Sequence, residues 1–318
     1  MTTTPPPARL PGTDALRATR TLAATQGGVL LRRQAWECGL GDARIRALVG
    51  RGQWRPLEYG VLLVDAERYA DTGPPLLAAL WAAHLRCGPR STIALGSAAR
   101  AHGLGGPARG LPWVDVVVPR GQRPRPGRRL LVHQADLRPG EIVHLGRLPL
   151  TSPVRTLTDL LLRLHAPEAL ALLDSALHHH LVGPPELGAV ARALAFRRSE
   201  PATRALRLLP HADGRSAGPL ESRIRWDCVL GGVPPDSLDH PVRQPGGERI
   251  LARVPFRWGP AIPGRPPLLG LVDGPGAPRT LPPAAGRVLR FHWNDALTPG
   301  RCAARVREAL AKSPAGTG

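Results

Sequence analysis

The sequence is short of several residue types, and each shortage argues against a class of protein. Lys312 is the only lysine among 318 residues, and aromatic residues make up 4%. The four cysteines are far apart and form no CxxC pair, which disfavours zinc ligation and a disulfide framework. No glycine-rich GK[ST] loop occurs, and no run approaches the ~18 apolar residues of a membrane span. These absences indicate a cytoplasmic protein with reduced thiols, no metal, no cofactor and no membrane partner.

Acidic residues are scarce relative to basic ones. Lysine and arginine total 43 against 24 aspartates and glutamates, which gives a formal net charge of +19. This excess favours a polyanionic partner, nucleic acid before membrane, although a GC-rich coding sequence produces the same composition. The distribution of the charge along the chain is more informative than the total. Residues 72–150 carry 11 basic and three acidic side chains, and residues 215–318 carry 15 basic and eight acidic side chains. Residues 1–12 lack the apolar core of a signal peptide and are expected to be a disordered tail.

Two short helices are predicted near the N-terminus. Residues 31–38 have helical composition and are followed by Gly39, a common helix stop. In the second helix, over residues 42–49, apolar side chains recur at i, i+3 and i+4 and predict one buried stripe. The members of that stripe are Ile45, Leu48 and Val49.

A β-hairpin is expected directly after the second helix. Apolar residues alternate between Trp54 and Leu63, with a turn near residues 58–60. Helix, turn, helix and hairpin are the order of a winged helix-turn-helix, which we predict over residues 13–71. In that fold the second helix enters the major groove of double-stranded DNA, and neighbouring basic groups contact phosphates. The residues expected at DNA are Arg44, Arg46 and Ala47 in the groove, Arg32, Arg33, Arg51 and Arg55 at phosphates, and Trp54 bracing the wing.

The same stretch resembles the N-terminal domain of AbiEi-type antitoxins of type IV toxin–antitoxin systems. The runs that carry the resemblance are Gly27-Gly28-Val29, Arg32-Arg33-Gln34-Ala35, Ile45-Arg46-Ala47-Leu48-Val49, Gly52-Gln53-Trp54 and Tyr59-Gly60-Val61. The resemblance implies a DNA-binding domain of a transcription regulator. It also implies a cognate partner, either a nucleotidyltransferase-like toxin or its promoter.

Residues 72–212 are expected to form an α+β middle domain. The predicted helices cover 76–85, 93–102, 153–164, 168–181 and 185–195, and the predicted strands cover 113–118, 130–133, 142–145 and 148–150. The first two strands are expected to pair as a hairpin with a long loop. That loop carries Arg120, Arg123, Arg125, Arg128 and Arg129, which are either phosphate contacts or the solvated side chains of a hairpin loop. The antitoxin resemblance extends here through Gly96-Ser97-Ala98-Ala99, the VDVVVPRG segment and Thr151-Ser152-Pro153.

A domain boundary is expected within residues 195–217, where apolar periodicity is lost, and a third domain over residues 213–318. Its predicted elements are helices over 220–230 and 299–312 and strands over 250–258, 268–273 and 287–293. This order resembles the restriction-endonuclease-like fold of the small very-short-patch-repair endonucleases. The matching residues are Glu221-Ser222, Val254 to Trp258, Val272-Asp273-Gly274, Arg287 to Phe291 and Trp293.

Nucleases of this type need two or three acids around a divalent metal, which activates a water. The family pattern is a helix Glu, then Val-Asp-Phe on one strand and Glu-x-Asp-Gly on the next. Glu221 matches the helix acid, but Pro255 stands at the strand Asp and Leu271 at the strand Glu. We therefore expect a catalytically inactive domain in which Glu221 and Asp273 are remnants, or simply a helix-start acid and a turn residue. A metal-dependent DNA endonuclease is the alternative function, and a protein-binding module is a further one.

Overall fold

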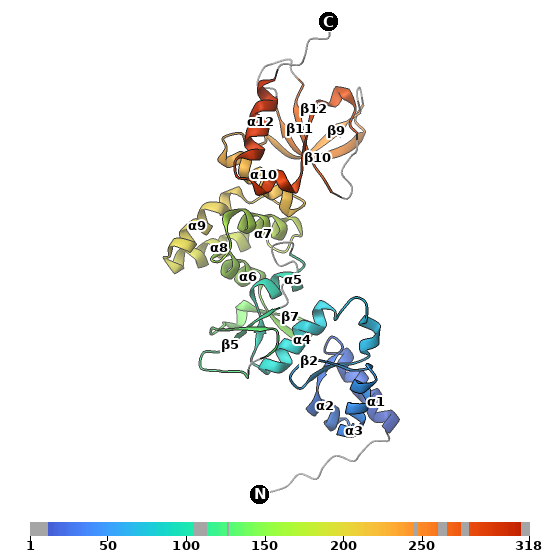
Figure 1. Ribbon diagram of the computed structural model, residues 1–318. Coiled ribbons are helices and arrows are strands. Elements are labelled where there is room, and N and C mark those ends of the chain that lie inside the picture. The colour runs from blue at the N-terminus through green and yellow to red at the C-terminus, as the bar shows by residue number, and fades with distance from the viewer. Residues whose placement is uncertain are drawn as a thin grey trace. The chain divides into compact units, whose positions relative to one another are not determined.

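The protein is a mixed α+β chain with several sheets (Figure 1). The computed structural model describes residues 12–104, 113–125, 127–244, 247–259, 266–274 and 280–312. The chain divides into two compact units, one within residues 1–103 and 108–156 and the other within 104–107 and 157–318. Residues 72–212, predicted as one middle domain, therefore contribute to both units. Of the predicted tail, residues 1–11 lie outside the described residues, and Gly12 is the first residue of α1.

The first unit begins with three helices and a three-stranded sheet. Its elements are α1 (Gly12–Ala24), β1 (Val29–Leu31), α2 (Arg32–Glu37), α3 (Asp42–Gly50), β2 (Arg55–Glu58) and β3 (Val61–Leu63). The strands are antiparallel neighbours in the order β1-β3-β2. Both predicted helices and the hairpin are present. The sequence analysis did not predict β1. Because this strand extends to Leu31, α2 begins at Arg32, one residue later than expected.

Both faces of this small sheet are buried, because successive side chains of a strand point to opposite sides. Leu30 and Leu62 pack with Ile45 and Leu48 in a core that also includes α1 and α2 residues. Ile45 and Leu48 are 1% and 4% exposed, so the predicted buried stripe of α3 is confirmed for these two residues, whereas its third member, Val49, is only half-buried against the same core. On the other face, Val29, Val61 and Leu63 join a core with α4 (Leu76–Cys87) and the second sheet. The first 71 residues thus share a core with α4 and the second sheet.

The second sheet of the first unit has five strands in the order β6-β5-β4-β8-β7. Its strands are β4 (Thr92–Ile93), β5 (Val114–Val118), β6 (Leu130–Gln134), β7 (Ile142–Leu145) and β8 (Leu148–Thr151), and α5 (Leu95–Ala101) packs on β5. The predicted hairpin of β5 and β6 is wrong, because the two strands are parallel, with Val114 opposite Leu130 and Val118 opposite Gln134. A connection between parallel strands must return along the strand length. The segment between them, described at residues 119–125 and 127–129, is therefore a crossover loop.

A run of helices comes next, and the second unit begins within its first member. The helices are α6 (Pro153–Leu161), α7 (Ala166–His178), α8 (Pro184–Arg197) and α9 (Glu200–Leu208). Short 3-10 turns occur at η1 (Ala66–Tyr69), η2 (Pro139–Glu141), η3 (Leu209–His211) and η4 (Pro283–Ala285). Helix α9 lies within residues 195–217, where we expected no apolar periodicity, but its buried residues Ala202, Ala205 and Leu208 recur every three residues, so that expectation is wrong. Pro201 occupies the first turn of α9, where a missing N–H costs no helical hydrogen bond.

The C-terminal part of the second unit is a four-stranded sheet with helices against it. Its elements are α10 (Pro219–Leu230), β9 (Ser237–Arg243), β10 (Ile250–Trp258), β11 (Leu268–Val272), β12 (Arg287–Phe291), α11 (Trp293–Leu297) and α12 (Arg301–Ala311). The order is β12-β11-β10-β9, with β11 and β12 parallel and the other pairs antiparallel. Figure 1 shows α10 and α12 side by side, and Phe256, Trp258 and Phe291 fill the core with residues of both helices.

All four cysteines are free thiols. Cys87, Cys228 and Cys302 are buried, and burial raises the pKa of Cys87 to about 11 and that of Cys302 to about 12. These thiols are therefore protonated at neutral pH and pack as small apolar side chains. Within the described residues, no helix is long and apolar enough to cross a membrane.

Candidate functional site

Helix α3 separates its apolar and basic side chains. Ile45 and Leu48 are in the core, whereas Arg44 and Arg46 are exposed and Ala47 is half-buried. In the described part of the chain, neither arginine has a carboxylate within ion-pair distance. Both cations therefore face solvent and are available to an external anion, and the predicted face of α3 is the one that the structure exposes.

The predicted phosphate contacts differ in how available they are. Arg32 begins α2, is half-buried, and its Nη2 lies 2.9 Å from Oδ1 of Asp42 at the start of α3. Arg33 is exposed, with its Nε 3.3 Å from Oε1 of Glu37 one turn later. Arg51, at the end of α3, is exposed and has no ion-pair partner among the described residues. Of these three arginines, Arg51 is the one whose charge is unpaired.

Two predicted contacts are less exposed than a DNA contact requires. Trp54 is 1% exposed and packs with Ile45 and Leu48, so it supports the hairpin from the core, as a residue bracing the wing would, and offers no surface to DNA. Its place in an alternating apolar run was equally compatible with a core position. Arg55 is half-buried in β2, and its Nη2 is buried with no hydrogen-bond partner in the described structure. Arg55 lines a recess of about 320 Å³ together with Arg128 and Arg129.

The turn between β2 and β3 holds the crossover loop. Glu58, which ends β2, is only 5% exposed, and its carboxylate accepts hydrogen bonds from the backbone N–H groups of Arg128 (2.7 Å, Oε2) and Arg129 (2.9 Å, Oε1). The next residue, Tyr59, is 56% exposed, and the guanidinium carbons of Arg86 and Arg128 lie 5.5 and 5.2 Å from its ring centroid. The sequence did not reveal these contacts, because Glu58 and Arg128 are 70 residues apart.

The loop arginines themselves are mostly free of carboxylates. Arg120 lies near Asp136, with Nε 3.7 Å from Oδ2. The other four are exposed, and none of them has an ion-pair partner within the described chain. These four are Arg123, Arg125, Arg128 and Arg129. The structure therefore places two of these cations, Arg128 and Arg129, next to the β2–β3 turn, where their backbone N–H groups bind Glu58.

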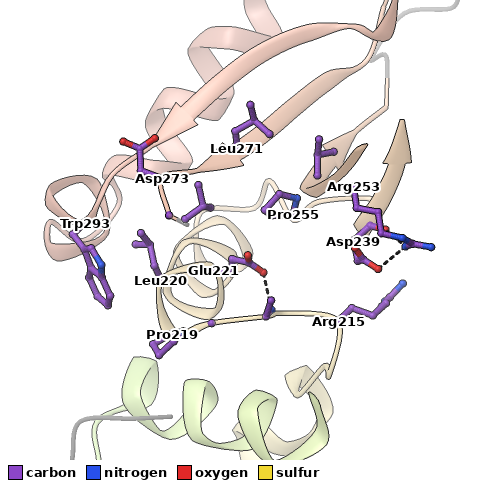
Figure 2. Close-up of a pocket in the computed structure, with 15 residues that line it drawn as sticks. Arg215, Pro219, Leu220, Glu221, Asp239, Arg253, Pro255, Leu271, Asp273 and Trp293 are labelled. Atoms are coloured by element: carbon purple, nitrogen blue, oxygen red, sulfur yellow. Dashed lines mark hydrogen bonds and ion pairs between the residues drawn. The ribbon is translucent and has the colours of Figure 1, made fainter. Parts of the chain in front are cut away.

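A second candidate site is a pocket of about 430 Å³ in the second unit (Figure 2). Its walls come from the start of α10, from β9 and β10, and from the end of β11. The four residues at the acid positions of the nuclease pattern, Glu221, Pro255, Leu271 and Asp273, all line it. Leu271 is fully buried and packs with Val254 and other apolar residues. The metal-ligand positions of the pattern thus meet at one pocket, where a proline and an aliphatic side chain occupy two of them.

The carboxylates of this pocket already have partners. Asp239 Oδ2 lies 2.5 Å from Nη1 of Arg253, and Asp273 Oδ2 lies 2.5 Å from Nδ1 of His292. Glu221 Oε2 accepts the backbone N–H of Ala217 at 2.8 Å, and burial raises the pKa of the Glu221 carboxyl. Figure 2 shows Glu221, Asp239 and Asp273 at different walls of the pocket. Among the described residues, no group of three or more His, Cys, Asp or Glu side chains could hold a metal ion.

Asp239 is a pocket residue that the sequence did not single out. It lies opposite Pro255, since the register pairs Val254 with His240 and Phe256 with Leu238. Pro255 has no N–H to donate, and Asp239 adopts a left-handed conformation with φ of 47°. Nη1 of Arg253 donates to the Asp239 carbonyl oxygen at 2.9 Å. The proline therefore disturbs the ladder locally, and a side chain binds the carbonyl group there.

Comparison with known proteins gives relatives without a described activity. No protein-family model matches the chain. It is 34% identical over 192 residues to the uncharacterized proteins MT2308 (strain CDC 1551 / Oshkosh) and Rv2248 (strain ATCC 25618 / H37Rv) of Mycobacterium tuberculosis, a match covering 60% of this chain and 67% of each relative. The crystal structure of RV2827C protein from Mycobacterium tuberculosis is similar with a TM-score of 0.41 and 17% identity over 74% of this chain and 86% of that chain.

Proposed function

The chain belongs to the same family as MT2308 and Rv2248 of Mycobacterium tuberculosis, and we propose that it is a double-stranded-DNA-binding transcriptional regulator of the antitoxin type. The observation that carries this proposal is the division of α3, which buries Ile45 and Leu48 and exposes Arg44 and Arg46 without carboxylate partners in the described chain. A helix that reads the major groove needs this division, because arginine recognises guanine edges with two donors while the opposite face packs on the domain.

The fold that we propose for residues 13–71 is a winged helix-turn-helix. Support comes from the sequence of α2, α3 and the β2–β3 hairpin, and from the hydrogen bond of 2.8 Å between the Arg32 N–H and the Gly60 carbonyl, which joins α2 to the hairpin turn. In this proposal α3 is the reading helix and the hairpin is the wing. A cognate nucleotidyltransferase-like toxin, or its promoter, is the proposed partner on the strength of the AbiEi resemblance.

For residues 213–318 we propose a restriction-endonuclease-like domain without catalytic activity. Pro255 and Leu271 stand at two metal-ligand positions of the pattern, and Leu271 is fully buried among apolar side chains. Asp273, at the third strand position, is paired with His292. A carboxylate that is already paired, beside a proline and a leucine, offers too few oxygen ligands for the two or three that the chemistry needs. This argument favours the regulator over the endonuclease alternative.

The test is a binding titration with wild type, Arg44→Ala and Arg51→Ala on two duplexes, one selected from a random pool by the full chain and one of random sequence. Arg44→Ala should lose on the order of 1–3 kcal/mol on the selected duplex and little on the random one. Arg51→Ala should weaken both equally and flatten the slope of log K against log salt by about 0.9. Arg51 is preferred to Arg55 for this purpose, because Arg55 is half-buried.

Two results would contradict the proposal. Wild type that binds neither duplex at moderate salt would show that the helix pair is not a DNA-reading element. The same conclusion holds if Arg44→Ala and Arg51→Ala both match wild type on both duplexes. The protein-binding alternative would then lead.

A further inference from the structure

Glu58 has a buried carboxylate, which is costly for the fold unless its charge is compensated. At 5% exposure it has lost most of its hydration, and a buried carboxylate is tolerated when hydrogen bonds replace the water. Both of its oxygens are used, and both bind backbone N–H groups of the crossover loop, at Arg128 and Arg129. The charge of Glu58 therefore fixes the main chain of the loop, and the two arginine side chains remain exposed.

Tyr59 adds a second attachment at the same place. Its ring contacts the guanidinium groups of Arg86 and Arg128, yet the residue remains 56% exposed. A cation over an aromatic face is attracted to it and keeps its outward-facing N–H donors. The ring thus orders the guanidinium of Arg128 without neutralising its charge.

The surface formed in this way continues to the reading helix. Gly60, the last residue of the turn, accepts the backbone N–H of Arg32 at 2.8 Å. Arg32 in turn pairs with Asp42, the first residue of α3. Glu58, Tyr59, Gly60, Arg32 and Asp42 therefore form an unbroken chain of contacts from the crossover loop to the N-terminus of α3, within a single unit.

We infer that the described part of the crossover loop, residues 119–125 and 127–129, is a second phosphate-binding element for double-stranded DNA, held against the wing at Arg128 and Arg129 by Glu58 as a positioning residue. The inference rests on the proposed function, and it adds the loop to the DNA-binding surface. A backbone that is already fixed at Arg128 and Arg129 loses less conformational entropy on binding, so the contacts of these two arginines add more affinity. A loop of exposed arginines that served only for solubility would need no buried carboxylate to hold its backbone.

The Glu58→Gln variant separates this inference from simple electrostatics. The substitution raises the net charge by one, so charge alone predicts tighter binding to DNA. Glutamine retains one carbonyl acceptor but presents an NH₂ group to the other backbone N–H, so one of the two attachments is lost. We expect weaker binding, with a shallower dependence of log K on log salt, because loop arginines no longer hold their positions.

A thermal melt shows whether Glu58→Gln is folded. If it is not, a loop variant and a control variant still test the inference. Arg123→Ala/Arg125→Ala removes two exposed cations of the loop. Arg147→Ala removes an exposed arginine between β7 and β8, at the other edge of the five-stranded sheet from β6. Each lost phosphate contact should flatten the salt slope by about 0.9 and weaken binding roughly eightfold at about 0.1 M salt, whereas the control should match wild type.

The measurement is fluorescence anisotropy of a labelled random-sequence duplex, titrated with the full chain between about 50 and about 200 mM salt. Glu58→Gln binding as tightly as wild type, or the double loop variant behaving like Arg147→Ala, would overturn this inference. In that case the effect of Arg44→Ala on a selected duplex would still support the proposed function. Wild type that fails to bind either duplex would overturn both.

Discussion

Two parts of this chain carry a similar excess of positive charge, but they differ in how many of their arginines are paired with carboxylates. Residues 72–150 have 11 basic and three acidic side chains, and residues 215–318 have 15 and eight. In the crossover loop four arginines are exposed without carboxylate partners in the described chain. In the second unit, by contrast, several arginines are paired. These pairs are Arg215–Asp213, Arg223–Glu168, Arg225–Asp174, Arg253–Asp239 and Arg305–Asp295. Pairing, more than net charge, determines which cations a polyanion can reach.

The buried pair of the second unit should give the largest effect. Asp174 on α7 and Arg225 on α10 have side chains 1% and 7% exposed, and Oδ2 of Asp174 lies 2.6 Å from Nη2 of Arg225. Asp174→Ala would leave the guanidinium buried without its partner. We expect a loss of roughly 3–5 kcal/mol in unfolding free energy, measured by urea titration of the full chain.

The control is Asp239→Asn, which breaks a pair of the same chemical type at the surface and keeps a residue that tolerates the left-handed backbone at position 239. The side chains of Arg253 and Asp239 are 54% and 43% exposed, so water screens their attraction. The expected loss is at most about 1 kcal/mol. Equal losses for the two variants would show that burial does not distinguish these pairs.

Much of the local structure can be predicted from the order of apolar residues. The period of α3 correctly predicted that Ile45 and Leu48 are buried, and the apolar run of β5 predicted a strand whose five residues are all buried. Two elements that the sequence analysis did not predict, α9 and β9, each contain a proline. Pro201 lies in the first turn of α9, where it is tolerated, and Pro241 lies in β9, an edge strand that can omit an N–H donor.

Pairing between distant segments could not be read from the sequence. The connection between β5 and β6 is long enough to be either a hairpin loop or a crossover. Only the register of the two strands shows that they are parallel. The contact of Glu58 with the loop is invisible for the same reason. Trp54 illustrates another limit, because an aromatic residue beside arginines fits both a wing surface and a core position. The four nuclease-pattern positions were assigned by resemblance, and the structure gathers them at one pocket.

A smaller effect is expected at Glu221, where burial raises the pKa of the carboxyl. The folded state then holds the proton more tightly than the unfolded chain, whose glutamates titrate near about 4.3. The protonated carboxyl therefore contributes to the free energy of unfolding. This contribution is fully present below that value and is lost as pH rises through the pKa of the folded state. Glu221→Gln keeps an acceptor for the Ala217 N–H and removes the charge. The variant should therefore be more stable than wild type at neutral pH, by less than the loss from Asp174→Ala.

The check is urea unfolding of both proteins at several pH values. The difference in unfolding free energy should shrink as pH falls toward about 4, because wild-type Glu221 becomes protonated there. A Gln variant that is less stable than wild type at neutral pH would mean that the ionised carboxylate stabilises the pocket. That result would mean that the negative charge of Glu221 stabilises the folded protein, and the interpretation of Glu221 as a remnant would be wrong.

The two units should also differ in their action on DNA, because we expect binding by the first and no cleavage by the second. Pro255 and Leu271 supply no oxygen side chain, and Asp273 is paired with His292. We therefore expect no nicking of supercoiled plasmid or mismatched duplex above the buffer blank with Mg²⁺ or Mn²⁺. If nicking occurs, the variants decide its origin: activity lost in Glu221→Ala or Asp273→Ala, but kept in Glu308→Ala on the exposed face of α12, would place it in this pocket. The domain would then be an enzyme with a rearranged set of ligands, and the contrast between a DNA-binding first unit and an inactive second unit would be wrong.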